Sequence, residues 1–321
     1  MPIHNSSKPL VIFPDADAEG IALLAEALQT IDASSITIQS HLGVPDSDDA
    51  WIERVAPAEG LLLGWQLPDA ALKSADKLRA ISFLGTGASD HIDLAIATAQ
   101  GVHVMNVSGY GDDAVAEHAI ALMFAAARNV VSLDRRLRIG EWPSSQGLQL
   151  RGRRLAVVGL GGIGRRMVEI GRGLGMDVVA WNRSAETGNT ESHGVALLPL
   201  DELLATSDVV SLHVALNEDT TGMIDGRRLR LMKLNAILIN TSRGAVIDEA
   251  ELVRVLDDGH LRTAALDVFS AEPAPADHRL LNHERTIVTP HVAFNTHDAS
   301  LRLFQMAVQN LVDHFASSDI K

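Results

Sequence analysis

The chain has 321 residues, more than one ordinary hydrophobic core accommodates, which predicts two domains. Hydrophobic residues make up 46% and charged residues 21%, values typical of a globular protein and not of a disordered one. The net charge of −14 disfavours a nucleic-acid partner, which would need a basic surface, and the lack of cysteine excludes disulfides, thiolate metal sites and cysteine nucleophiles.

Targeting and metal signals are weak along the whole sequence. The N-terminus has no apolar segment of signal-peptide length, and no apolar run reaches the length that a membrane span requires. A cytoplasmic protein is therefore expected. The 13 histidines are scattered, and none forms a convincing ligand spacing with another, so we expect no metal site.

Short apolar runs alternate with helical patterns in the first third of the chain. Strands are predicted over residues 10–13, 36–38, 61–63 and 80–84. This alternation predicts a parallel sheet covered on both faces. One long helix is predicted next, over about 113–140, and it would join two domains, pack in a subunit interface or simply belong to the core.

A second series of the same kind follows. Its predicted strands cover residues 155–158, 178–181, 209–212, 236–239 and 287–289. An amphipathic helix is predicted over 299–315. The shared rhythm of the two series predicts an α/β fold with two doubly wound parallel-sheet domains.

A glycine-rich turn follows the first strand of the second series. Gly159 permits a tight turn, Gly161 lets the backbone approach a pyrophosphate, and Gly164 lets the next helix press on the sheet. The helix N-terminus then offers unpaired N–H groups to the phosphates. The contacts predicted for a bound dinucleotide are Gly159, Gly161, Gly162, Ile163 and Gly164.

The residue that reads the ribose is expected at the end of the next strand. Asn182, Arg183 and Ser184 stand there, where an NAD-specific site usually has an acidic residue. A neutral Asn182 removes repulsion against a 2′-phosphate, and Arg183 can pair with one. This favours NADP, or use of both cofactors; the alternative is a solvated Arg183 with Asn182 serving NAD.

Three further segments follow strand-like runs, at residues 240–244, 265–273 and 289–291. They are therefore expected at carboxyl ends of strands, where open α/β sheets bind ligands. Together with other motifs they resemble the D-isomer-specific 2-hydroxyacid dehydrogenases over nearly the whole chain. The segments that carry the resemblance are 115–118, 159–164, 208–213, 240–249, 267–273 and 290–291.

The resemblance implies a domain arrangement and an activity. A Rossmann cofactor domain (107–292) would be inserted in a flavodoxin-like substrate domain (1–106 with 293–321). The activity would be hydride transfer between NAD(P)H and the alpha carbon of a small 2-oxo or 2-hydroxy acid, similar to glyoxylate or hydroxypyruvate. A homodimer is expected.

The resemblance also implies the catalytic residues, and chemistry explains their types. Arg243 would hold the substrate carboxylate through a planar fork. His291 would give a proton to the alkoxide that hydride arrival creates. Glu272 beside the ring would favour imidazolium and fix its orientation.

Other positions follow from the same resemblance. His213 and Thr241 would line the cofactor cleft, and Asp267 would lie near the nicotinamide carboxamide. Backbone N–H groups around Thr86 and Gly87 would bind the substrate carboxylate, although this loop is one residue longer than the family pattern.

The sequence also departs from the family at substrate positions. Residues 64–66 (Gly-Trp-Gln) lack the Arg found in members that handle phosphorylated acids, which favours an uncharged substrate tail. Trp65, Tyr110 and Phe294 would shape that pocket or serve ordinary packing. The chain ends at Lys321, so no regulatory extension is expected.

Two other functions fit parts of the sequence. A relative oxidising another small anion, such as phosphite, could use the same scaffold; the formate type is disfavoured because it lacks a residue equivalent to Glu272. A nucleotide-sensing protein resembling the family's corepressors would keep the nucleotide site and act through partner grooves. Turnover of 2-oxo acids separates these possibilities.

Overall fold

The computed structural model describes residues 8–183 and 191–318, and the chain folds as two compact units. The first comprises the described parts of Met1–Gly111 and Thr296–Lys321, and the second those of Asp112–Asn295. The division falls a few residues from the predicted crossings at 106/107 and 292/293. That the units act as substrate and cofactor domains stays a proposal.

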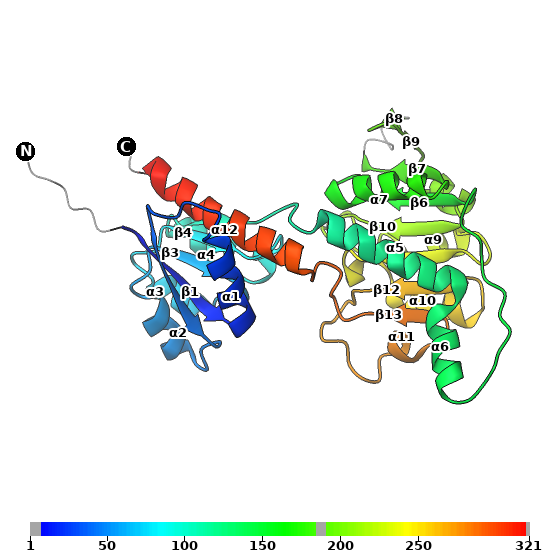
Figure 1. Ribbon diagram of the computed structural model, residues 1–321, viewed down its shortest axis with the longest axis horizontal. Helices are drawn as coiled ribbons and strands as arrows, with labels where there is room; N and C mark the ends of the chain where they lie inside the picture. The colour runs from blue at the N-terminus through cyan, green and yellow to red at the C-terminus, as the bar shows by residue number, and fades with distance from the viewer. Residues whose placement is uncertain (1–7, 184–190, 319–321) are drawn as a thin grey trace, which may run out of the picture. The chain divides into compact units, whose positions relative to one another are not determined.

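The first unit contains a parallel sheet in the order β2-β1-β3-β4-β5 (Figure 1). This order is the flavodoxin-like form of a doubly wound sheet. In chain order its elements are β1 (Leu10–Ala16), α1 (Ala18–Ala27), β2 (Thr37–Leu42), α2 (Asp48–Val55), β3 (Gly60–Leu63), α3 (Asp69–Ser74), β4 (Ala80–Phe83), a 3₁₀ helix (Ala88–Asp90), α4 (Leu94–Ala99), β5 (His103–Met105) and α12 (His297–Ser318).

Helices cover both faces of this sheet. The last helix, α12, packs beside α1 on one face, and Phe304, Leu311 and Phe315 belong to the buried cluster there (Figure 1). A separate cluster on the other face includes Trp51 and Leu72. Burial on both faces explains why β3 and β4 are continuous apolar runs without alternation.

The second unit is a larger doubly wound sheet in the order β13-β12-β11-β10-β6-β7-β9-β8, parallel except at β8 (Figure 1). The strand order reverses at the β6–β10 pair, as in a Rossmann fold. In chain order its elements are α5 (Asp112–Arg128), α6 (Val130–Arg138), β6 (Arg154–Val158), α7 (Gly162–Gly173), β7 (Asp177–Trp181), β8 (Glu191–Ser192), β9 (Val195–Leu197), α8 (Leu200–Thr206), β10 (Val209–Leu212), α9 (Gly226–Leu231), β11 (Ile237–Asn240), a 3₁₀ helix (Gly244–Val246), α10 (Glu249–Asp257), β12 (Thr263–Leu266), α11 (Arg279–Asn282) and β13 (Thr286–Val288).

The predicted long helix over 113–140 is wrong as a single element. The structure breaks it into α5 and α6 at Asn129, which adopts the left-handed conformation with φ +56°. Asn is one of the few residues that tolerate this conformation, and it ends the hydrogen-bond ladder of α5 there. The short strands β5, β8 and β9 were not predicted because each has three residues or fewer and carries little periodicity.

Within the described residues, no single helix combines the length and apolar character of a membrane span. Taken together, α5 and α6 satisfy that test of length and composition, but the pair is bent by 63° at its break.

Candidate functional site

The glycine-rich turn lies between β6 and α7, at the point where the strand order reverses. Gly159 has φ +105°, and a Cβ there would lie 2.5 Å from the carbonyl oxygen of His213. A Cβ on Gly164 would lie 1.8 Å from the carbonyl oxygen of Gly159. These two positions therefore require glycine for the backbone to close on itself.

Gly161 is free of such crowding. It is the N-cap of the 12-residue helix α7, and a Cβ built on it meets no described atom within 4 Å. Open space at a helix N-terminus, bounded by a tight glycine turn, fits a bound phosphate group. Ile163 anchors the turn by packing against the core of the second unit.

Asn182 and Arg183 follow β7, the strand beside the glycine turn. The amide of Gly159 donates to the carbonyl oxygen of Trp181 at 2.8 Å, which holds the two strand ends together. Asn182 is half-buried and Arg183 is exposed. Ser184, also predicted to contact the cofactor, lies outside the described residues.

Two buried polar atoms near the strand ends have no hydrogen-bond partner among the described residues: His213 Nδ1 and Thr241 Oγ1. The Nε2 atom of His213 lies 2.8 Å from Ser211 Oγ, and burial lowers the pKa of His213 to about 3, so its ring is neutral. Unpaired buried polar groups are costly and need a partner. A dinucleotide bound at these strand ends would supply polar atoms, so these residues fit the predicted cofactor.

His291 and Glu272 form a close pair. The Nδ1 atom of His291 lies 2.6 Å from Glu272 Oε2, while Glu272 Oε1 accepts a 2.8 Å hydrogen bond from the Phe269 amide. The carboxylate is therefore held from two sides, and Nε2 is the ring nitrogen that is not bonded to Glu272. The sequence predicted this proximity, and the structure brings the two side chains together.

The pKa of Glu272 lies below its ordinary value of 4.5. Burial raises this pKa, but the hydrogen bonds from His291 and Phe269 and the charges of His291 and Arg243 together outweigh burial. A carboxyl with a lowered pKa contributes stability above its unfolded value and loses it as the pH falls through the lowered value. Glu272 therefore stays ionised at neutral and mildly acidic pH.

Arg243 follows β11 and precedes the 3₁₀ helix. Its carbonyl accepts a hydrogen bond from Asn240 Nδ2 at 2.9 Å, which closes the turn locally. The next residue must be glycine, because a Cβ on Gly244 would lie 1.9 Å from the carbonyl carbon of Phe269. This close approach joins the Arg243 turn to the segment that positions Glu272, and it brings the guanidinium near enough for its charge to act on that carboxyl.

Asp267 is fully buried at the end of β12. Its carboxylate accepts hydrogen bonds from Thr289 Oγ1 at 2.5 Å, the Val292 amide at 3.0 Å and the Ala293 amide at 2.9 Å. Its carbonyl accepts a 2.7 Å bond from the His291 amide. Asp267 thus holds the loop that carries His291; its predicted contact with the nicotinamide stays a prediction.

Two contributors to this loop were missed at the sequence level. His118 Nε2 on α5 lies 3.0 Å from Thr289 Oγ1 and 3.6 Å from Asp267 Oδ1. The only signal was that His118 closes the 115–118 motif, and no role followed from that motif. Thr289 had no signal beyond its place before Pro290.

Thr86 and Gly87 belong to the first unit, directly after β4. Thr86 is exposed, and the loop is fixed by a 3.0 Å hydrogen bond from the Ala88 amide to Asn106 Oδ1. Their predicted contacts with a substrate carboxylate stay a prediction.

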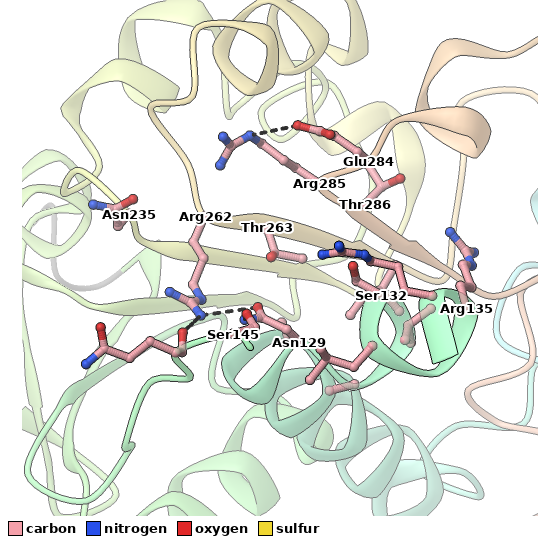
Figure 2. Close-up of a pocket in the computed structure, with 17 residues that line it drawn as sticks. Asn129, Ser132, Arg135, Ser145, Asn235, Arg262, Thr263, Glu284, Arg285 and Thr286 are labelled. Atoms are coloured by element: carbon pink, nitrogen blue, oxygen red, sulfur yellow. Dashed lines mark hydrogen bonds and ion pairs between the residues drawn. The ribbon is translucent and has the colours of Figure 1, made fainter. Parts of the chain in front are cut away.

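A pocket of about 610 Å³ lies at the other end of the strands in the second unit (Figure 2). Asn235 and Arg262 precede β11 and β12 there, whereas the residues of the candidate site follow those strands. Arg135, Arg262 and Arg285 point in different directions without a shared focus, and Arg262 donates to Asn129 Oδ1 at 3.2 Å (Figure 2). No predicted site residue lines this pocket, so its size does not make it the functional site.

A parallel doubly wound sheet with a glycine turn at its switch point defines a dinucleotide-binding protein. Comparisons identify the family. Residues 120–293 match the NAD binding domain of the D-isomer specific 2-hydroxyacid dehydrogenases. A glyoxylate reductase of Korarchaeum cryptofilum is 38% identical over 276 residues, covering 84% of this chain and 83% of that protein.

Two further relatives agree with this result. A D-3-phosphoglycerate dehydrogenase of Archaeoglobus fulgidus is 33% identical over 292 residues, covering 90% of this chain and 55% of that protein. The crystal structure of the TT0316 protein from Thermus thermophilus superposes with a TM-score of 0.80 at 31% identity, covering 94% and 95% of the two chains. The chain belongs to the D-isomer specific 2-hydroxyacid dehydrogenase family and is an NAD(P)-dependent oxidoreductase.

Because Gly161 lies beside open space, a substitution there should affect cofactor binding without affecting folding. The change Gly161→Ala adds a Cβ where no described atom lies within 4 Å, so thermal unfolding should be nearly unchanged while the Kd for NADPH rises. Gly164→Ala is the matched comparison, because its Cβ collides with backbone and should lower the melting temperature. Equal NADPH affinity in wild type and Gly161→Ala would place the phosphates elsewhere.

Proposed function

We propose that this chain reduces a small 2-oxo acid similar to glyoxylate or hydroxypyruvate, and oxidises the 2-hydroxy acid in reverse, with a preference for NADPH. The observation that carries the proposal is the His291–Glu272 pair at 2.6 Å, next to Arg243 and on the same unit as the glycine turn. The glyoxylate reductases among its relatives support the substrate class.

Arg243 is proposed to bind the substrate carboxylate. A guanidinium presents two parallel N–H groups that match a carboxylate, and it stays charged at every working pH. Held in this way, the keto group next to the carboxylate has one orientation relative to the imidazole. The reduced nicotinamide supplies the hydride to the carbonyl carbon.

His291 is proposed to donate the proton. The carbonyl oxygen gains negative charge as the carbon is reduced, and Nε2 of an imidazolium gives it a proton. Glu272 accepts a hydrogen bond from Nδ1 of His291, so the charged ring is stabilised and its orientation is fixed. In the oxidation direction the neutral ring takes the proton back through the same nitrogen.

The substrate tail is proposed to be uncharged. In the segment after β3, the amides of Gly64 and Trp65 donate to the carboxylate of Asp15, at 3.2 and 2.7 Å. An acidic group at this position repels a phosphorylated tail, and no arginine occurs in residues 64–66 to bind one. This favours glyoxylate-like acids over phosphoglycerate, although phosphoglycerate dehydrogenases also occur among the relatives.

The preference for NADPH rests on Asn182 and Arg183, which follow the strand next to the glycine turn. An uncharged side chain at 182 accepts a 2′-phosphate without repulsion, and Arg183 is exposed and able to pair with it. NAD is the second cofactor considered. The cytoplasmic location expected from the sequence stays a prediction.

A homodimer is proposed, with a second copy covering α6 and the segment after it. Val130, Leu137, Ile139 and Trp142 are 53%, 53%, 74% and 90% exposed there. A run of large exposed apolar side chains is typical of an interaction surface.

The activity is tested by steady-state assays of glyoxylate, hydroxypyruvate, pyruvate and 3-phosphohydroxypyruvate with NADPH and NADH. Glyoxylate or hydroxypyruvate should give the highest kcat/KM. Binding of NADPH without turnover of any 2-oxo acid would instead favour a nucleotide-binding role.

Removing the proton donor tests the proposed chemistry. His291→Ala should lower kcat by about 10²–10⁴-fold, because the alkoxide loses its acid, while the Kd for NADPH stays near wild type. His297→Ala removes another exposed histidine, paired with Glu26 at 3.2 Å, and should keep full activity. A fully active His291→Ala enzyme would refute the assignment.

Cofactor preference is tested by two opposite changes. Asn182→Asp places a carboxylate beside the 2′-position and should raise the NADH-to-NADPH ratio of kcat/KM. Arg183→Ala should weaken the binding of NADPH but not that of NADH, because NADH carries no 2′-phosphate. Ratios unchanged in both variants would reject the ribose assignment.

The subunit interface is tested by sedimentation equilibrium. Ile139→Glu combined with Trp142→Glu should give monomers, because two charges cannot be buried against a second copy without partners. Leu42→Glu alters an apolar residue that is 67% exposed on the first unit and should leave the dimer intact. Dimers in both variants, or a monomeric wild type, would contradict the proposal.

A further inference from the structure

We infer that His118 on α5 is a positioning residue, which fixes the loop of His291 through Thr289 and Asp267. The inference rests on the proposed role of His291 as proton donor, and it adds a contribution from a helix distant in sequence from that residue.

The contacts form a short chain. His118 Nε2 lies 3.0 Å from the hydroxyl oxygen of Thr289, and that hydroxyl donates to Asp267 Oδ1 at 2.5 Å. Because the hydroxyl has a single proton, which goes to Asp267, the nitrogen of His118 donates to the hydroxyl oxygen. His118 Nε2 also lies 3.6 Å from Asp267 Oδ1, so the N–H that donates to Thr289 is close to the carboxylate as well.

Asp267 connects these contacts to the loop that carries His291. Its side chain is 0% exposed, and its two oxygens accept the amides of Val292 and Ala293 at 3.0 and 2.9 Å. A buried carboxylate is costly unless donors surround it. Thr289 donates to Oδ1 as well, and His118 lies 3.6 Å from that oxygen, so losing both side chains would remove one hydrogen bond and a nearby N–H group from Asp267 and leave it free to shift.

His291 stands in the middle of this anchored segment with φ +53°, a backbone conformation that residues with a Cβ rarely adopt. Such a conformation persists only where the surroundings fix it. Here the fixed points are Thr289 before His291 and the two amides after it. A relaxed loop would carry the ring away from Glu272, to which it is bonded at 2.6 Å.

The helix that carries His118 is held rigidly by its packing. His118 lies on a 17-residue helix that packs against α7 and against the strands β11, β12 and β13. Its neighbours Ala116 and Ala119 are fully buried, whereas the side chain of His118 keeps 23% of its surface exposed. The helix therefore places the imidazole without depending on it for its own packing.

Four variants test this inference: His118→Leu, which removes the donor; His118→Gln, whose amide nitrogen replaces Nε2; Thr289→Val, which removes the hydroxyl; and the double variant His118→Leu with Thr289→Val. His118→Leu should lower kcat for glyoxylate by between about tenfold and 100-fold, the range expected for a displacement of about 1 Å. KM and the Kd for NADPH should change little, and His118→Gln should recover most of the loss.

The kcat of the double variant should be no lower than that of the slower single variant, because both changes break the same set of contacts. Ile120→Val, on the same helix but outside this set of contacts, should have the kcat of the wild type. Additive losses, a His118→Gln enzyme as poor as His118→Leu, or a His118→Leu enzyme with wild-type kcat would each overturn the inference.

A readout without turnover separates this inference from the proposed function. The ¹H–¹⁵N resonances of the His291 imidazole should shift in His118→Leu and in Thr289→Val, but not in Ile120→Val. Shifted resonances in a protein that reduces no 2-oxo acid would refute the proposed function and keep the positioning role. Unshifted resonances in an active enzyme would refute the positioning role alone.

Discussion

The bond between His291 Nδ1 and Glu272 Oε2 sets the chemistry available at this site. One ring nitrogen is hydrogen-bonded to a carboxylate, so in the proposed function the other would exchange the proton with the substrate. The carboxylate is itself fixed by the Phe269 amide, and its pKa lies below the ordinary value, so it is ionised at neutral pH. An orientation fixed from both sides is what general acid–base catalysis requires.

The surrounding fold supports that bond at several points. Gly244 lets the turn of Arg243 lie against the backbone of Phe269, and buried Asp267 ties the end of β12 to the loop after β13. Parallel strands end at one edge of the sheet, so segments distant in sequence arrive together there. The glycine turn before α7 lies at the switch point of the same sheet, so the turn and the His291–Glu272 pair belong to one unit.

The sequence was sufficient for much of this architecture because local signals were strong. Apolar runs marked the long buried strands, and the glycines of 159–164 marked a turn whose backbone contacts allow no side chain at two of them. The break at Asn129 was not predicted, because apolar residues continue beyond it in Val130, Val131 and Leu133. Strands as short as β8 have too few residues to show a period.

The site was only partly predictable for a different reason. Motifs singled out Arg243, Glu272 and His291, and the structure brings the last two into contact, but the contact of His118 with Thr289 spans 171 positions and has no local signature. Likewise, the hydrogen bonds of Asp267 to the loop of His291 had no local signal, and its predicted contact with the cofactor stays a prediction. Such contacts depend on packing that only the folded chain defines.

The pH dependence of kcat/KM for glyoxylate reduction, in wild type and in Glu272→Gln, tests the central claim most directly. A neutral amide stabilises an imidazolium less than a carboxylate does, because it lacks the negative charge, so the loss of activity with rising pH should begin at a lower pH in the variant. At acidic pH the difference in kcat/KM between the two enzymes should narrow. An identical pH profile would show that the carboxylate does not control the proton donor.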